Sequence, residues 1–196
     1  MIKLPEPKHD SDVSIEETLV RRRSIRDYTH EPLTLEEVSQ LLWAGQGITS
    51  DWGGRTAPSA GALYPIELYV IVGDVKNLAA GLYKYKPERH ELVMVLEGDI
   101  RSRLADAALG QSPVKHGVVD IVLTSVNHRT TRKYGDRGIK YVLIEIGHAG
   151  QNICLQATAL ELGSVMIGAF HDEEVSSLLK LPREETPLYI IPIGRQ

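Results

Sequence analysis

The spacing of apolar positions predicts two helices in the first quarter of the chain. Within Val13–Val20, Ser14 can cap a helix, acidic residues follow in the first turn, and apolar residues stand at Ile15, Leu19 and Val20. A second helix is predicted after Pro32, because Thr34 and Glu37 stand at capping-box spacing before a helical apolar period. Roughly twenty residues without regular periodicity then lead to Pro65, and loops of this length are usually functional or mobile.

Short β-branched runs predict the strands of a sheet. They lie at Leu68–Val72, Gly81–Tyr85, Leu92–Leu96, Val118–Val126, Ser164–Phe170 and Leu188–Arg195. Asp120 is the one charge in its run, a composition typical of a strand buried on both faces. Shorter helices are expected near Asp99–Ala108 and from a capping Asp172 to Leu179. The loose alternation of helices and strands indicates an α+β or mixed α/β class, with helices packed on a central sheet.

The longest regular element is predicted to be a helix over Gly138–Gly163. Its second half, Ile146–Leu162, is apolar on nearly every face, and such a helix must be buried all round. Gly147 and Gly150 stand one turn apart and would permit close approach of another helix, so a homodimer is expected. Within this helix we expect His148 to be a hydrogen-bonded core residue. Cys154 is expected to be a small core hydrophobe.

Composition narrows the class of protein. The 196 residues fit one domain, residues 1–196, and the apolar runs are too short or too interrupted for a membrane span. The start of the chain has two prolines and no apolar signal segment, so a cytoplasmic location is expected. The net charge of −4 argues against a nucleic-acid partner, the single cysteine excludes an internal disulfide, and no spacing of His, Asp and Glu indicates a metal site.

Four arginines in six residues, Arg21, Arg22, Arg23 and Arg26, form a local basic cluster. One interpretation places them in solvent at the end of the first helix, where cations suit the helix dipole. In the other, Arg22 and Arg26 share one helical face and converge with Ser24 on a phosphate, which guanidinium groups bind bidentately. The cluster alone leaves both open.

Four segments, taken in order, carry a family resemblance. They are Arg22–Tyr28, Ala57–Pro65, Glu145–Asn152, and Val165–Phe170 with the terminal Ile193–Arg195. Together they resemble the nitroreductase superfamily of FMN-dependent oxidoreductases, in particular its SagB-type branch of azoline dehydrogenases, which oxidise thiazolines and oxazolines in peptides. The resemblance implies a three-layer α+β fold with a central mixed, mainly antiparallel sheet between helices. It also implies an interlocked homodimer with two FMN molecules at the subunit interface.

The resemblance assigns the basic cluster to the flavin. Arg22, Arg23 and Ser24 would hold the FMN phosphate and ribityl chain, and Arg195 would return to the phosphate. Arg26 would approach the pyrimidine end of the ring, where a cation stabilises the negative charge of the reduced flavin.

Two further segments match flavin-contacting parts of the family. Pro58, Ser59 and Ala60 match the segment that reaches the flavin from the partner subunit, although they could also be a turn leading into the next strand. Gly168 and Ala169 match the segment passing flavin N5, where glycine permits close approach of a backbone N–H, although they could also simply end a buried strand.

One departure and one candidate for catalysis remain. Ala62 stands where typical nitroreductases carry an asparagine, so that polar contact to the ring is missing.

Lys133 and Tyr134 match the lysine–tyrosine pair that serves as the acid/base element of the azoline dehydrogenases, and removal of a proton from carbon requires such a base. Lysine could serve only if burial or neighbouring cations lower its pKa. The pair could instead frame the entrance to the long helix.

The function predicted from these residues is an FMN-dependent oxidoreductase. It would exchange hydride between flavin N5 and an NADH or NADPH donor or a small organic substrate. The alternative is a flavin-binding, storage or redox-partner protein with little turnover, and a third hypothesis is an anion-binding α+β domain without flavin. The motifs identify neither the substrate nor the preferred nicotinamide.

Overall fold

The computed structural model describes residues 1–196, and its centre is one seven-stranded sheet. The strand order is β1-β4-β3-β2-β5-β7-β6, and every pair of neighbours is antiparallel. The strands are β1 (Ile2–Lys3), β2 (Ile66–Val72), β3 (Gly81–Lys86), β4 (Glu91–Glu97), β5 (Val119–Ser125), β6 (Leu162–Ser164) and β7 (Thr186–Arg195). The predicted α+β class is confirmed.

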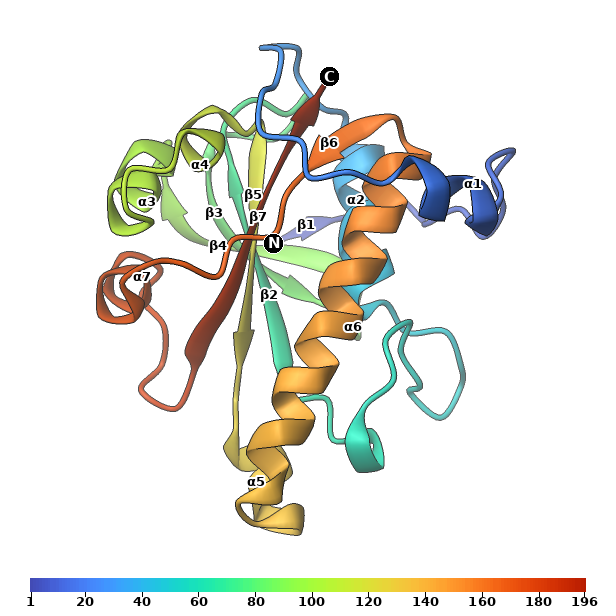
Figure 1. The fold of residues 1–196 in the computed structure, drawn as a ribbon, viewed down its shortest axis with the longest axis vertical. Helices are drawn as coiled ribbons and strands as arrows, with labels where there is room; N and C mark the ends of the chain where they lie inside the picture. Colours follow the sequence, from blue (N-terminus) through green and yellow to red (C-terminus); the bar gives the residue numbers. More distant parts are fainter.

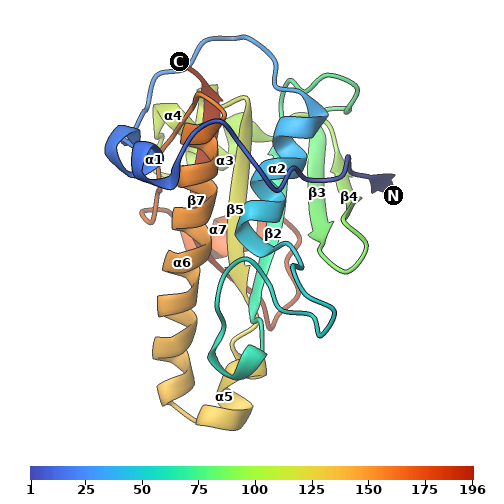
Figure 2. The same ribbon diagram turned by 90° about the vertical axis from the view of Figure 1, so that its right-hand side faces the viewer.

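Helices cover both faces of the sheet (Figure 1). They are α1 (Ile15–Arg21), α2 (Leu35–Gln46), α3 (Arg101–Ala107), α4 (Ser112–His116), α5 (His128–Tyr134), α6 (Arg137–Ala159) and α7 (Asp172–Leu178), with a 3₁₀ turn at Ala60–Ala62. One apolar core lies between the sheet and the pair α2 and α6, which Figure 2 shows from the side. A second core lies between the opposite face and α3, α4 and α7. No helix combines the length and apolarity needed to cross a lipid bilayer.

Local side-chain contacts explain the two predicted helix starts. Ser14 Oγ accepts from the backbone N–H of Glu17 at 3.1 Å and caps α1. At α2, Thr34 Oγ1 accepts from Glu37 N at 3.2 Å while the Glu37 carboxylate accepts from Thr34 N at 2.8 Å. The capping box predicted from the sequence is therefore confirmed.

The buried strand β5 confirms another expectation. All seven of its residues are buried, including Asp120, which has no exposed surface. Neither carboxylate oxygen of Asp120 has a hydrogen-bond partner, and burial raises its pKa well above the usual value.

The boundaries of three predicted elements need correction. The long helix ends at Ala159, because the chain turns at Glu161 with φ at 58° and enters β6. The strand expected over Ser164–Phe170 pairs only as far as Ser164, and beyond it Ile167 makes one isolated bridge. Asp172 is the first residue of α7 and does not cap it; that position belongs to His171.

Helix α6 is buried along one side and open along the other, so the prediction that its second half is buried all round is wrong. Ala149, Ile153, Cys154 and Ala157 lie in the core, which confirms the expectation for Cys154. The expectation for His148 is wrong, because this residue is exposed. Leu143, Ile144, Gly147 and His148 form an uncovered face of α6, on which the Leu143 side chain is 54% exposed and a Cβ at Gly147 would meet no atom within 4 Å.

Candidate functional site

The Arg22–Tyr28 segment leaves α1 and is fixed to the sheet edge formed by β6 and β7. Ile25 N donates to Ser164 O at 3.0 Å, next to a parallel bridge between Ser24 and Ser164. Tyr28 Oη lies within 2.8 Å of Ile25 O and 3.1 Å of Pro192 O. These bonds hold the backbone on the sheet, and they leave the arginine side chains on the outside.

Ion pairing divides the four arginines of the cluster. Arg21 pairs with Glu17 at 2.9 Å, as expected for residues one helical turn apart. Arg22, Arg23 and Arg26 make no ion pair with any carboxylate of the chain. Arg23 uses Nη1 for the carbonyl oxygens of its own turn. Three guanidinium groups in this segment therefore have no carboxylate counter-ion within the chain, as an anion site requires.

Arg195 lies beside this segment but is already paired. Its Nη2 donates to both carboxylate oxygens of Glu37, at 2.9 and 3.0 Å, and Glu31 lies at 3.9 Å. Glu37 also closes the capping box of α2. A contact between Arg195 and a phosphate would therefore compete with a partly buried carboxylate.

Gly168 and Ala169 are exposed, four and five residues after the end of β6. A Cβ added at Gly168 would touch only the ring of Tyr189, at 3.4 Å, which is ordinary contact. Packing within the chain therefore does not require glycine at this position, and its open side is free for a ligand. Ala169 O accepts from Gln111 Nε2 at 2.8 Å, which fixes the segment.

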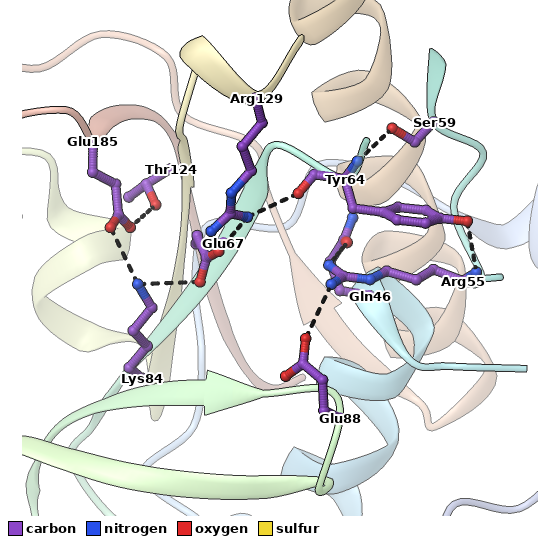
Figure 3. A network of polar contacts seen from close by, with 10 residues as sticks. All are labelled: Gln46, Arg55, Ser59, Tyr64, Glu67, Lys84, Glu88, Thr124, Arg129 and Glu185. Carbon is purple, nitrogen blue, oxygen red and sulfur yellow. Dashed lines mark hydrogen bonds and ion pairs between the residues drawn. The ribbon is translucent and has the colours of Figure 1, made fainter. Parts of the chain in front are cut away.

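The loop that contains Pro58, Ser59 and Ala60 is tightly folded and anchored on α6. Ser59 Oγ donates to Glu145 Oε2 at 2.6 Å and accepts from Tyr64 N at 2.9 Å, the second of which is drawn in Figure 3. Left-handed φ values occur at Gly61, Ala62 and Tyr64. Left-handed backbone at non-glycine residues costs free energy and clusters at functional sites. Pro58 is exposed at the surface.

Glu145 is a functional candidate that the sequence analysis missed. Its side chain comes from α6 and is 2% exposed, and Oε1 has no hydrogen-bond partner. Burial raises the pKa of Glu145 to about 7, although the hydrogen bond from Ser59 and the charge of Arg55 oppose the shift. A single carboxylate inside the otherwise apolar run Val142–Ile146 was the signal available in the sequence.

Lys133 and Tyr134 come from α5 and lie against the same loop. A Cβ at Gly61 would stand 2.7 Å from Tyr134 Oη and 2.9 Å from Lys133 Nζ. Lys133 Nζ also lies 5.4 Å from the centroid of the Tyr134 ring. The structure therefore brings together the predicted acid/base pair and the predicted Pro58–Ala60 segment. Lys133 is exposed in the chain.

The two halves of the predicted site lie at different heights along α6. Ser59 is hydrogen-bonded to Glu145 in the first half of the helix. Arg22 instead lies near Cys154, nine positions farther on, where its positive charge opposes the rise that burial causes in the Cys154 pKa. Nine residues correspond to about 14 Å of helix. Figure 1 shows α5 at one end of α6 and α1 near the other. Within one chain the Pro58 loop and the arginine segment remain apart.

These features define an α+β domain with arginines that lack carboxylate partners at one sheet edge, and with a lysine–tyrosine pair beside a loop with left-handed backbone. The family model described as the Nitroreductase family matches residues 19–195. The chain therefore belongs to the nitroreductase family, as the resemblance implied.

Known relatives agree with this assignment. A protein of Methanocaldococcus jannaschii, provisionally named a nitroreductase, is 45% identical over 195 residues, with 100% of this chain and 96% of the relative covered. A solved structure from Ralstonia eutropha, provisionally titled a nitroreductase, matches with a TM-score of 0.85 and 29% identity, covering 99% of this chain and 88% of that one. The NADPH:FMN oxidoreductase of Vibrio harveyi shares the fold, with a TM-score of 0.67, 22% identity, and coverage of 92% and 68%.

Proposed function

We propose that this chain is an FMN-dependent oxidoreductase acting as a homodimer. The observation that carries the proposal is the set of three unpaired guanidinium groups, Arg22, Arg23 and Arg26, beside the ion-paired Arg21. A phosphate ester is the ligand that such groups bind most specifically. Bound FMN would supply a ring that exchanges hydride at N5 with a nicotinamide or a small organic substrate.

The residues around this segment fit such a cofactor. Arg22, Arg23 and the exposed Ser24 offer donors to a phosphate, and Arg26 would place its charge where the reduced ring is negative. Gly168 and Ala169 leave an open backbone surface near the same sheet edge. Arg195 would contact the phosphate only if it gave up its hydrogen bonds to Glu37.

The same geometry supports the proposed homodimer. The Pro58–Ala60 loop does not reach the arginine segment of its own chain, so a complete site would take this loop from a second copy. The uncovered apolar face of α6, with Leu143 and Ile144, is a surface on which that copy would pack.

Lys133 and Tyr134 would move the substrate proton. Their position against Gly61 places them beside the loop that the partner would lend to the site. A lysine acts as a base when it is desolvated, and Lys133, exposed in one chain, would be desolvated by the partner or by the substrate. The nicotinamide donor is proposed from the NADPH:FMN oxidoreductase of the same fold.

Anaerobic reduction tests the proposal. The FMN-loaded protein is mixed with NADH or NADPH, and the flavin absorbance is followed before and after addition of nitroaromatics, quinones and a thiazoline peptide. The proposal expects bleaching by a nicotinamide and reoxidation with turnover by at least one acceptor. Bound flavin without turnover would favour a storage or redox-partner protein, and failure to bind flavin would exclude both.

A further inference from the structure

The sheet opens between β2 and β3. Their ladder runs from the pair Val72 and Gly81 to the pair Tyr69 and Lys84 and stops there. Strand β2 nevertheless continues to Ile66, still paired with β5, and β3 continues to its end, still paired with β4. The two strands therefore separate beyond Tyr69, and a cavity of about 380 Å³ borders the opening.

A buried amide without a partner lines this cavity. The Gln46 side chain is 1% exposed, and its Oε1 accepts from Arg55 Nη1 at 2.7 Å. Its Nε2 has no hydrogen-bond partner. Leaving a buried donor unsatisfied is costly, and such a group calls for an acceptor that the chain itself does not provide.

Four cations line the cavity, namely Arg55, Lys84, Lys86 and Arg129. Two of them, Lys84 and Arg129, are neutralised by carboxylates (Figure 3). Lys84 Nζ lies 3.1 Å from Glu67 and 3.1 Å from Glu185. Arg129 pairs with Glu67 as well and donates to Tyr64 O at 2.9 Å. These two cations and two carboxylates balance one another, so they leave no net charge for a ligand.

Arg55 is a third cation, and its carboxylate partner is distant and mostly exposed. The side chain is 11% exposed and lies over the Tyr64 ring, 4.6 Å from the centroid. Its carboxylate partner, Glu88, stands 3.4 Å away with a side chain that is 64% exposed. Burial lowers the pKa of Arg55, which shows the cost of holding this charge away from water. Because the Glu88 side chain is mostly exposed and its contact with Arg55 is long, another carboxylate can take its place.

We propose that this opening is a binding site for a small organic carboxylate. The carboxylate would replace Glu88 beside Arg55 and accept from Gln46 Nε2, so that the unsatisfied amide gains an acceptor and Arg55 keeps a carboxylate partner. Its apolar body would lie against Leu63 and Ile66, which also line the cavity. A monoanion fits this wall better than a phosphate dianion, because Glu67 stands in the same cavity. The site is separate from the arginine segment and does not depend on the proposed redox function.

Calorimetric titration of the full chain with benzoate tests the proposal, with benzamide as the uncharged analogue. Benzoate should bind at one site per chain, and benzamide should bind at least tenfold more weakly. Arg55→Gln should weaken benzoate binding at least tenfold, whereas Glu88→Gln should tighten it severalfold because the competing carboxylate is gone. Arg89→Gln is the matched control. Arg89 lies on the same β3–β4 turn as Glu88, its side chain is 71% exposed, and its replacement should leave the affinity for benzoate unchanged.

Three results would overturn the proposal. They are no benzoate binding to either the wild-type or the Glu88→Gln protein at millimolar concentration, equal binding to wild type and Arg55→Gln, or weaker binding after Glu88→Gln. Because Glu88 is exposed, its variant tests the site even if Arg55→Gln fails to fold, which circular dichroism would reveal. Binding that persists in Arg55→Gln and perturbs flavin absorbance would place benzoate at the flavin and contradict the assignment.

Discussion

At the scale of single residues, the chain separates arginines that stabilise the fold from arginines that are free to bind. Arg21 is held by Glu17, and Arg195 is held by Glu37. Arg22 and Arg26 have no carboxylate partner, although they belong to the same cluster as Arg21. Sequence alone could not make this distinction, because the pairing depends on which acidic side chains the fold brings near.

The first prediction compares neighbouring arginines. Arg22→Ala should weaken FMN retention roughly tenfold to a hundredfold, because a charge-assisted hydrogen bond contributes about 1.5–3 kcal/mol. Arg21→Ala should leave retention unchanged and cost at most about 1 kcal/mol of stability, the usual limit for an exposed ion pair. Flavin absorbance after desalting measures retention. Equal loss in both variants would argue against a specific phosphate contact at Arg22.

The second prediction concerns Glu145 and pH. Burial raises the pKa of Glu145 to about 7 in the folded protein, from its usual value of 4.5. Between these values the unfolded chain releases the proton while the folded chain retains it, so the free energy of unfolding falls as pH rises. From about pH 5 to pH 8 the wild type should lose on the order of 2 kcal/mol more than Glu145→Gln.

Denaturant unfolding at several pH values measures this difference. Glu184→Gln, which removes an exposed carboxyl group, should follow the wild type throughout. If Glu145→Gln followed the wild type as well, Glu145 would not be a buried carboxyl group that titrates near neutrality.

At the scale of elements, helices and strands with a regular apolar pattern could be predicted from the sequence, whereas a helix made mostly of polar residues could not. The N-cap serine of α1, the capping box of α2 and the apolar run of β5 gave these elements correctly. Helix α5 was missed, because His128–Tyr134 carries almost no apolar period and its geometry depends on its contact with α6. The strand expected over Ser164–Phe170 was too long. Val165 and Ile167 pack in one core and Met166 packs against the other, so the segment alternates like a strand although its ladder ends at Ser164.

The third prediction tests the contact between α5 and the Pro58 loop. Lys133→Gln should lower turnover of the FMN-loaded enzyme by about a hundredfold or more, because general acid/base groups contribute at least that much. Flavin retention should stay at the wild-type level, since Lys133 is not one of the residues proposed to hold the phosphate. Lys140→Gln, an exposed lysine on α6, is the matched control for steady-state kinetics. Unchanged turnover in Lys133→Gln would remove it from the chemistry.

The fourth prediction tests the uncovered face of α6. Leu143→Glu should convert the dimer to monomer, because it would bury a charge in an apolar interface. Ser102→Glu, on an exposed position of α3, should leave the dimer intact. Light scattering after size-exclusion chromatography reports the mass, and circular dichroism checks the fold. A Leu143→Glu protein that remains dimeric would place the interface elsewhere.

At the scale of the whole molecule, one chain contains all the predicted parts of the site but does not assemble them. The order of the four motifs was sufficient to predict the family and the α+β fold. The distance between the Pro58 loop and Arg22 could not be predicted, because it depends on where along α6 each segment packs. Glu145 and the opening between β2 and β3 also escaped prediction, since burial and ladder ends are tertiary properties.

The central claim is that FMN binds to the arginine segment of a dimer. The most direct measurement titrates FMN into flavin-stripped protein and determines bound flavin per chain together with molecular mass, for the wild type and for Leu143→Glu. We predict one FMN per chain in a wild-type dimer, and loss of flavin from the monomeric variant. No flavin uptake by the wild type, or full uptake by the monomer, would contradict this account.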